Sequence, residues 1–119
     1  NDILEGSEHM LKAKYFYDNS HGWIVISEDI IKLIGLNADD FSSYSYFRVL
    51  NGKLYYALEE DADAHRLMRR VRARNMTIDI KETNDGYTSV IRTWSSIELL
   101  HTYKDYCYSG EQPPMVAAE

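Results

Sequence analysis

The apolar and polar positions of residues 44–59 alternate as they do in two paired strands of a β-hairpin. Asn51-Gly52 stands at the centre of this segment. Both central residues of a type I′ turn need φ > 0, and Asn-Gly is the dipeptide that most favours that turn. A two-residue turn then fixes the register of the two strands. The expected pairs are Leu50 with Lys53, Val49 with Leu54, Arg48 with Tyr55, Phe47 with Tyr56, Tyr46 with Ala57 and Ser45 with Leu58.

This register sorts the side chains of the hairpin onto two faces. The first face is apolar and is expected to join the core; it carries Phe47, Val49, Leu54, Tyr56 and Leu58. The second face combines tyrosines with charged residues; it carries Tyr44, Tyr46, Arg48, Lys53, Tyr55 and Glu59. Two interpretations of the second face stay open. The tyrosines can pack beneath a helix or the C-terminal segment with their hydroxyls in water, or they can form an exposed platform, as in protein interfaces and base-stacking sheets.

The segment before the hairpin predicts two short strands and a helix. Residues 13–18 and 23–26 are rich in aromatic and β-branched side chains, and the turn-forming stretch 19–22 separates them. Ser27 is suited to cap the N-terminus of a short helix, and Gly35 is suited to end it in the left-handed conformation. The elements predicted up to this point are therefore strand, strand and helix.

A second helix is expected after the hairpin. Asp61 is the predicted N-cap, apolar residues follow at helical spacing, and Asn75 stands just beyond the predicted end. Alternation then predicts a strand over 76–82, and 87–94 is expected to return beside it as a second hairpin.

A last helix is predicted near the C-terminal end. Ser95 and Glu98 have the spacing of a capping box, which predicts a helix over about 96–107. The element order ββαββαββα favours an α+β fold, in which two or three helices pack on one face of a mainly antiparallel sheet.

The length of 119 residues suits a single domain. Residues 1–10 resemble a vector-derived leader that ends in the His-Met of a cloning junction. Residues 109–119 contain glycine and two prolines and predict a flexible tail. The domain itself is therefore expected to span 11–108.

The net charge limits the classes of partner. It is −6 for the whole chain and −3 without residues 1–10, where 16 acidic side chains stand against 13 basic ones. This balance argues against simple electrostatic binding to nucleic acid or to an anionic membrane. Cys107 is the single cysteine, so no internal disulfide can form and a cytoplasmic location is expected. No apolar run approaches the ~20 residues that span a bilayer.

An arginine cluster marks the second predicted helix. Arg66, Arg69 and Arg70 lie opposite its apolar stripe. One interpretation is a solvated face, because basic residues toward the C-terminus complement the helix dipole. The other is a recognition surface for a phosphate backbone or an acidic partner.

No pattern of metal ligands or catalytic residues is recognisable. In the acidic run 59–63, Asp61 lies four residues before His65, but no second ligand pair follows at a known spacing. Nothing frames Cys107 or a serine as a nucleophile, and no glycine-rich phosphate loop is present. We therefore expect no metal, no cofactor and no enzymatic activity.

The loop triplet His21-Gly22-Trp23 is unusual among the turns of this chain. Glycine permits a tight bend at this position. The histidine and tryptophan can either plug the end of the sheet or line a contact surface, and both interpretations stay open.

Four segments together carry a resemblance to a known group of proteins. They are Tyr17-Asp18-Asn19-Ser20-His21-Gly22-Trp23, Leu33-Ile34-Gly35-Leu36, Ser43-Tyr44-Ser45-Tyr46 and Tyr56-Ala57-Leu58-Glu59-Glu60-Asp61-Ala62-Asp63. Their order resembles that of small uncharacterised proteins carried by phages, plasmids and their bacterial hosts, over roughly residues 15–94. The resemblance implies a mobile-element setting, in which small proteins often bind a host protein, including defence complexes, and block or redirect it.

Two functions are therefore weighed. The first is a non-enzymatic binding protein that modulates or inhibits a host protein complex, with a contact patch of Tyr44, Tyr46, Arg48, Tyr55, Trp23 and His21. The alternative is a nucleic-acid-binding module that uses Arg66, Arg69 and Arg70 together with the same sheet face. No membrane partner is expected, and a homodimer joined through the tyrosine face would also cover it.

Overall fold

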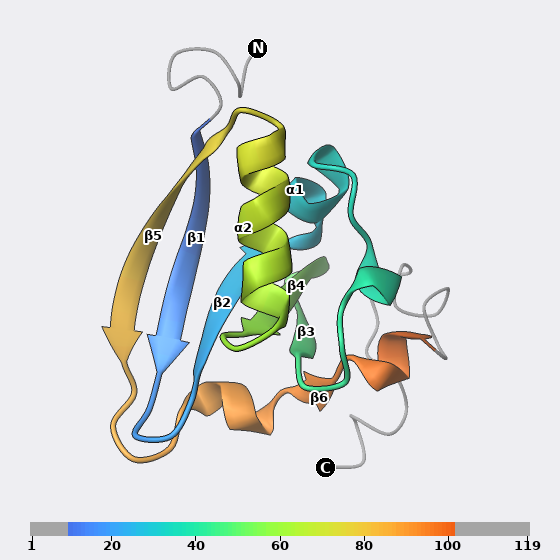
Figure 1. The fold of residues 1–119 in the computed structure, drawn as a ribbon. Coiled ribbons are helices and arrows are strands. Elements are labelled where there is room, and N and C mark those ends of the chain that lie inside the picture. Colours follow the sequence, from blue (N-terminus) through green and yellow to red (C-terminus); the bar gives the residue numbers. More distant parts are fainter. Residues whose placement is uncertain (1–9, 102–119) are drawn as a thin grey trace.

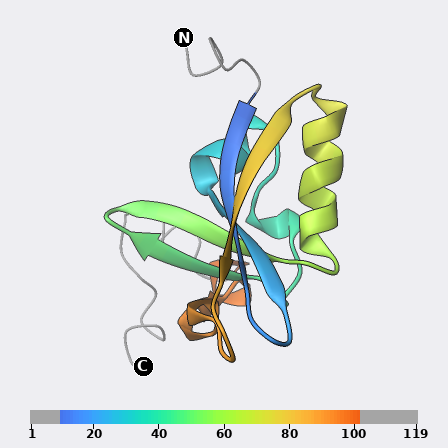
Figure 2. The same ribbon diagram turned by 90° about the vertical axis from the view of Figure 1, so that its left-hand side faces the viewer.

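The computed structural model describes residues 10–101, which form a six-stranded, mainly antiparallel sheet with helices packed on it (Figure 1). The strand order across the sheet is β5-β1-β2-β4-β3-β6. The α+β class predicted from the sequence is confirmed. The sheet is strongly twisted, and Figure 2 shows the β3–β4 hairpin projecting at a steep angle to β1 and β5.

Seven of the elements follow the predicted order of strand and helix, and the last part of the chain does not. The elements are β1 (Met10–Tyr17), β2 (Gly22–Ser27), α1 (Glu28–Leu33), η1 (Ala38–Asp40), β3 (Tyr46–Leu50), β4 (Lys53–Glu59), α2 (Asp63–Ala73), β5 (Thr77–Asn84), η2 (Val90–Thr93) and β6 (Ser95–Ser96). Residues 98–101 are helical again. The predicted leader except for Met10, the tail 109–119, Cys107 and the end of the last predicted helix lie outside the described residues.

The central hairpin has the predicted register. Strands β3 and β4 pair Leu50 with Lys53 and continue in step to Tyr46 with Ala57. Asn51 has φ 52° and Gly52 has φ 78°, as a type I′ turn requires. The five residues assigned to the apolar face are all buried.

The main core lies between the sheet and two helices on one of its faces. Helix α1 packs against β2 and β4, and α2 packs against β4 and β5 (Figure 1). The helices contribute Ile31, Leu67 and Val71, which meet Ile26, Phe47 and Leu58 from the strands. Burial of these large apolar side chains is the principal stabilising contribution to the fold.

Most predicted helix ends are confirmed. The Ser27 hydroxyl accepts a hydrogen bond from the N–H of Ile30 at the start of α1. Gly35 and Asn75 both adopt positive φ after their helices. The prediction that Asp61 caps α2 is wrong, because the helix begins at Asp63 and its N-cap residue makes no side-chain hydrogen bond.

The predicted second hairpin is wrong. Strand β5 pairs in parallel with β1 along its whole length, from Thr77 with Met10 to Asn84 with Tyr17. Residues 87–94 do not return beside β5. Instead, the Ser89 hydroxyl accepts a hydrogen bond from the N–H of Ile91 and caps the short helix η2, and the chain then reaches the opposite edge of the sheet as β6.

A second, smaller cluster lies on the other face of the sheet. Trp23 and Ala57 meet Ile91 of η2, with Tyr46 and Trp94 packed beside them. The helices α1 and α2 lie on one face, as predicted, and the short helix η2, in a segment predicted as a strand, lies on the other. The prediction that Ser95 caps the last helix is wrong, because its buried hydroxyl has no hydrogen-bond partner within residues 10–101 and the Ser96 hydroxyl accepts from the N–H of Glu98. Among the described residues, no helix has the length and apolar character needed to cross a bilayer.

Candidate binding groove on the open face of the sheet

The face of the sheet opposite α1 and α2 is only partly covered. Segment η2 lies over the end that carries Trp23, and the remainder of the face forms a groove of about 590 Å³. Four half-buried apolar or aromatic side chains form its floor and one wall: Phe16, Val25, Tyr55 and Trp94. They come from β1, β2, β4 and the segment after η2, so the strand order of the sheet assembles the groove.

Four lysines line the groove together with this apolar floor. They are Lys12 and Lys14 of β1, Lys53 of β4 and Lys81 of β5, and all four are exposed. Asp79 is the one acidic residue that lines the groove. The groove is therefore locally basic, although the whole chain carries a net charge of −6.

Two of the four lysines have acidic partners. Lys12 Nζ lies 3.6 Å from a carboxylate oxygen of Asp79, and Lys53 Nζ lies 3.0 Å from one of Asp29. The carboxylate of Asp29 raises the pKa of Lys53. Each of these ion pairs is exposed and contributes little to the stability of the fold.

The other two lysines face each other. Lys14 and Lys81 are direct partners in the parallel pairing of β1 and β5. Neither forms an ion pair with another described residue. Like charges at directly paired strand positions repel, so this pair costs the free protein some stability.

The residues predicted as a partner-binding patch are only partly brought together. Tyr46, Arg48 and Tyr55 share the open face and are half-buried, and Arg48 pairs with Tyr55 across the strands. Tyr55 lines the groove, whereas Tyr46 packs edge-on against the Trp23 ring at 6.1 Å. Tyr44 precedes β3 and is 70% exposed. Each interpretation of this face thus applies to a different tyrosine. Tyr46 packs beneath another segment, beside η2, whereas Tyr55 lines the open groove.

Trp23 is not available to a partner. Its side chain is only 2% exposed and lies beneath η2, with the guanidinium of Arg92 5.2 Å from the centre of its ring. The inclusion of Trp23 in the contact patch is therefore corrected: it plugs the end of the sheet. His21 is exposed at the β1–β2 loop. Gly22 packs so close to Tyr15 that a Cβ atom would lie 2.0 Å from its hydroxyl oxygen.

The arginine helix lies on the opposite side of the sheet from the tyrosines. Helix α2 packs on the main core, so Arg66, Arg69 and Arg70 cannot form one surface with the open face. Arg70 also has a structural role, because its Nη1 donates hydrogen bonds to the carbonyl oxygens of Ile34 and Gly35. The predicted combination of arginine helix and tyrosine sheet in one nucleic-acid site is therefore corrected.

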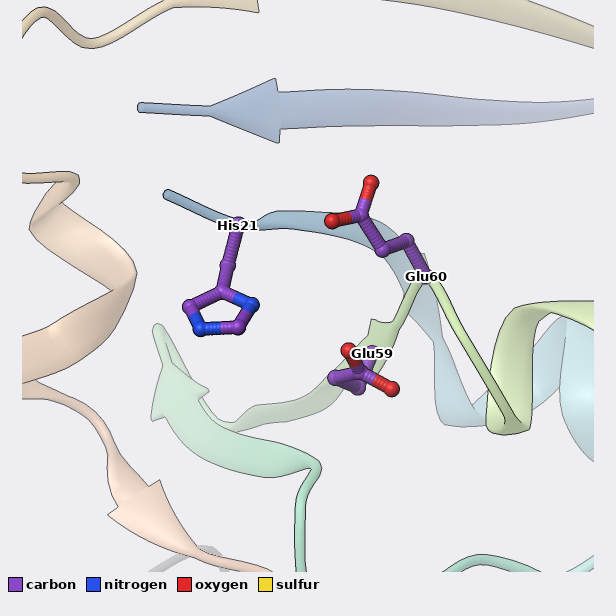
Figure 3. A group of neighbouring side chains, drawn as sticks. All are labelled: His21, Glu59 and Glu60. Atoms are coloured by element: carbon purple, nitrogen blue, oxygen red, sulfur yellow. The ribbon is translucent and has the colours of Figure 1, made fainter. Parts of the chain in front are cut away.

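A second group of polar residues lies where β2 begins and β4 ends. His21, Glu59 and Glu60 each offer one ligand atom, and these atoms lie within 4.8 Å of one another (Figure 3). One nitrogen and two carboxylates suit a divalent transition-metal ion. The Tyr15 hydroxyl donates a hydrogen bond to Glu60, and the N–H of Asp61 donates one to Glu59. The residues weighed from the sequence as ligands, Asp61 and His65, are exposed and do not belong to this group.

The electrostatics of this second group follow from burial. Desolvation raises the pKa of the Glu59 carboxyl, which is only 9% exposed. Desolvation, together with the hydrogen bond to Glu60, raises the pKa of Tyr15 to about 12. The Glu60 carboxylate therefore connects β1 with the residue that follows β4, and the Glu59 carboxylate accepts a hydrogen bond within the turn before α2.

Replacement of Glu59 by glutamine is expected to stabilise the protein at neutral pH. A carboxyl whose pKa is raised in the folded state favours folding below its unfolded pKa, and that contribution is lost as the pH rises through the folded pKa. Glu59→Gln removes the charge and keeps an acceptor, so thermal denaturation at pH 7 is expected to show a Tm higher by about 2 to 5 °C. The gain is expected to shrink in acid. Glu60→Gln is the matched control and brings no gain; a lower Tm for Glu59→Gln would contradict this account.

The lysines of the groove were not recognised from the sequence. Lys12 and Lys14 alternate with Leu11 and Ala13, a pattern that marks one polar face of a strand. That signal does not say which other strands lie beside it. Lys81 joins them only because β5 pairs with β1, more than 60 residues away in the chain.

The comparisons with known proteins give no match: no family model, no curated protein and no solved structure matches this chain.

Proposed function

We propose that this protein is a non-enzymatic binding protein whose open sheet face holds a partner protein. The observation that carries the proposal is the groove itself, which combines an aromatic floor with four lysines on the part of the sheet face that η2 leaves uncovered. Rigid aromatic side chains bury a large area with few rotatable bonds, and cations beside them fix orientation. The resemblance to phage- and plasmid-borne proteins supports a role as a modulator or inhibitor of a host protein complex in the bacterial cytoplasm, including a defence complex.

The buried acidic groups of the molecule support a binding role over a catalytic one. Asp18 accepts hydrogen bonds from Arg92 and from three backbone N–H groups, and Asp63 accepts them from Ser42 and Ser45. Each carboxylate is thus engaged in connecting segments of the fold. Neither lines the groove, where a substrate would bind.

The position of the arginines counts against nucleic acid as the partner. Proteins that bind single strands use a continuous basic track beside their stacking aromatics. Here the arginines of α2 and the lysines of the groove lie on opposite faces of the sheet. A long polyanion would also meet the net negative charge of the rest of the chain.

The proposal predicts that changes on the open face abolish partner capture. Tyr55→Ala combined with Arg48→Ala removes one aromatic and one cationic anchor, so we expect capture from a nuclease-treated host lysate to fall at least about tenfold. The captured protein is then purified and its Kd is measured with each variant. The matched control is Arg66→Ala with Arg69→Ala on the exposed face of α2, which is expected to change the Kd less than about twofold.

Three results would overturn the proposal. Equal loss in both double variants would show that the open face has no special role. Capture that disappears on nuclease treatment would indicate nucleic acid. A dimer of this chain in solution that dissociates in the Tyr55→Ala and Arg48→Ala variant would indicate a second copy as the occupant.

A further inference from the structure

We infer that the groove on the open face receives an acidic, extended segment of the partner that also carries apolar side chains, with Lys14 and Lys81 binding its carboxylates. The inference rests on the proposed function and names the chemistry of the partner. It starts from the two neighbouring lysines, Lys14 and Lys81, whose mutual repulsion is not compensated by an acidic side chain among the described residues.

The repulsion between Lys14 and Lys81 is the first step. They are direct partners on β1 and β5, both are exposed, and neither has an acidic partner among the described residues. In natural proteins most residues suit the local structure around them, and unfavourable local interactions are concentrated at functional sites. A carboxylate placed between the two ammonium groups would turn their repulsion into attraction for a ligand.

The other two lysines of the groove, Lys12 and Lys53, are already paired with acidic side chains, and this difference limits the class of ligand. Lys12 is engaged by Asp79 and Lys53 by Asp29, so these two sites carry less free positive charge. The uncompensated charge is therefore concentrated at the Lys14–Lys81 pair. A short acidic segment matches one concentrated positive site, whereas a phosphate backbone needs a basic track along its whole path.

The floor of the groove provides the apolar contacts for the bound segment. Val25 is the cross-strand partner of Lys14 on β2, so apolar surface begins directly beside the lysine pair. Phe16, Tyr55 and Trp94 continue this surface. An extended segment that alternates acidic and apolar side chains can place its carboxylates on the lysines and its apolar groups on the floor.

The test uses labelled peptides and fluorescence anisotropy. The probe is a peptide of alternating Glu and Phe or Leu, and two comparison probes are the same peptide with Lys in place of Glu and an oligothymidylate of similar length. We expect the acidic peptide to bind, with an affinity that falls as salt is raised, and the lysine peptide not to bind. Tighter binding of the oligothymidylate than of the acidic peptide would overturn the inference.

The variant Lys81→Glu separates binding from stability. It replaces a like-charge pair by an opposite-charge pair with Lys14, so we expect an unchanged or raised Tm. The same change is expected to weaken binding of the acidic peptide at least about tenfold. Arg66→Glu on α2 alters the net charge equally and is expected to leave binding within about twofold.

The outcomes also separate this inference from the proposed function. If no acidic peptide binds, or if Lys81→Glu binds as well as wild type, the inference is wrong. The proposed function is tested separately: it is supported if the Tyr55→Ala and Arg48→Ala variant loses partner capture, and it is wrong if capture is unchanged. If that capture is unaffected while the acidic peptide binds through Lys81, the groove binds acidic segments but does not hold the captured partner.

Discussion

Replacement of Asp18 by alanine is expected to lower the Tm by about 10 to 20 °C, which corresponds to the loss of a hydrogen-bonded ion pair with a buried carboxylate in a domain of this size. Asp18 Oδ2 lies 2.7 Å from Arg92 Nε and 2.8 Å from the N–H of Ser89, and Oδ1 accepts from the N–H groups of Ser20 and His21. Its side chain is fully shielded from water. The substitution therefore leaves several donors without an acceptor.

The same substitution is expected to release η2 from the sheet. Asp18 belongs to the β1–β2 loop, and both Ser89 and Arg92 belong to the segment that covers Trp23. Loss of this connection exposes the indole, so tryptophan fluorescence is expected to shift to longer wavelength before global unfolding. Asp61→Ala, an exposed acid that makes no side-chain hydrogen bond, is the control and is expected to change the Tm by no more than about 3 °C.

Acid is expected to weaken the wild-type protein through the same carboxylate. The guanidinium of Arg92 holds the pKa of Asp18 well below its ordinary value of 3.8. A depressed folded pKa gives stability that is present above the unfolded pKa and is lost as the pH falls toward the folded one. Urea denaturation at pH 7 and at about pH 3 is expected to show a greater loss of stability for the wild type than for Asp18→Ala. Equal losses would contradict the assignment.

The parts of the fold that were predicted correctly are those fixed by neighbouring residues. The Asn51-Gly52 turn sets the register of β3 and β4, and the alternation of side chains then assigns each residue to a face. The burial of Phe47 and Tyr56 follows from this local rule. Local patterning was therefore sufficient to assign the side chains of β3 and β4 to their faces, but not to place the other strands of the groove beside them.

The parts that were not predicted depend on contacts between distant residues. The turn after β5 has the composition of a hairpin loop, but Ser89 and Arg92 donate hydrogen bonds to the distant Asp18, which holds their segment over Trp23 and not beside β5. β5 then pairs in parallel with β1, which local periodicity cannot indicate. The groove was not predicted for the same reason: its lysines come from three strands that are far apart in the sequence.

The buried carboxylate of Asp63 is expected to be the second most sensitive site for stability. It is 3% exposed, and it accepts hydrogen bonds from the N–H and hydroxyl of Ser42 and from the hydroxyl of Ser45. The Ser45 hydroxyl in turn accepts from the N–H of Glu59 at the end of β4. One side chain thus connects the start of α2 with the loop before β3 and, through Ser45, with β4.

Asp63→Ala is expected to lower the free energy of unfolding by about 2 to 4 kcal/mol, because it leaves buried donors at Ser42 and Ser45 unsatisfied. Urea denaturation measures the total loss. Hydrogen exchange tests its location, because the amides of Ser42 and Glu59 are expected to lose protection before those of β1 and β2. Asp61→Ala, two residues earlier and exposed, is expected to leave these amides unchanged. Uniform loss of protection across the sheet would contradict this expectation. It would show that Asp63 stabilises the fold as a whole and that the loop before β3 is not stabilised separately.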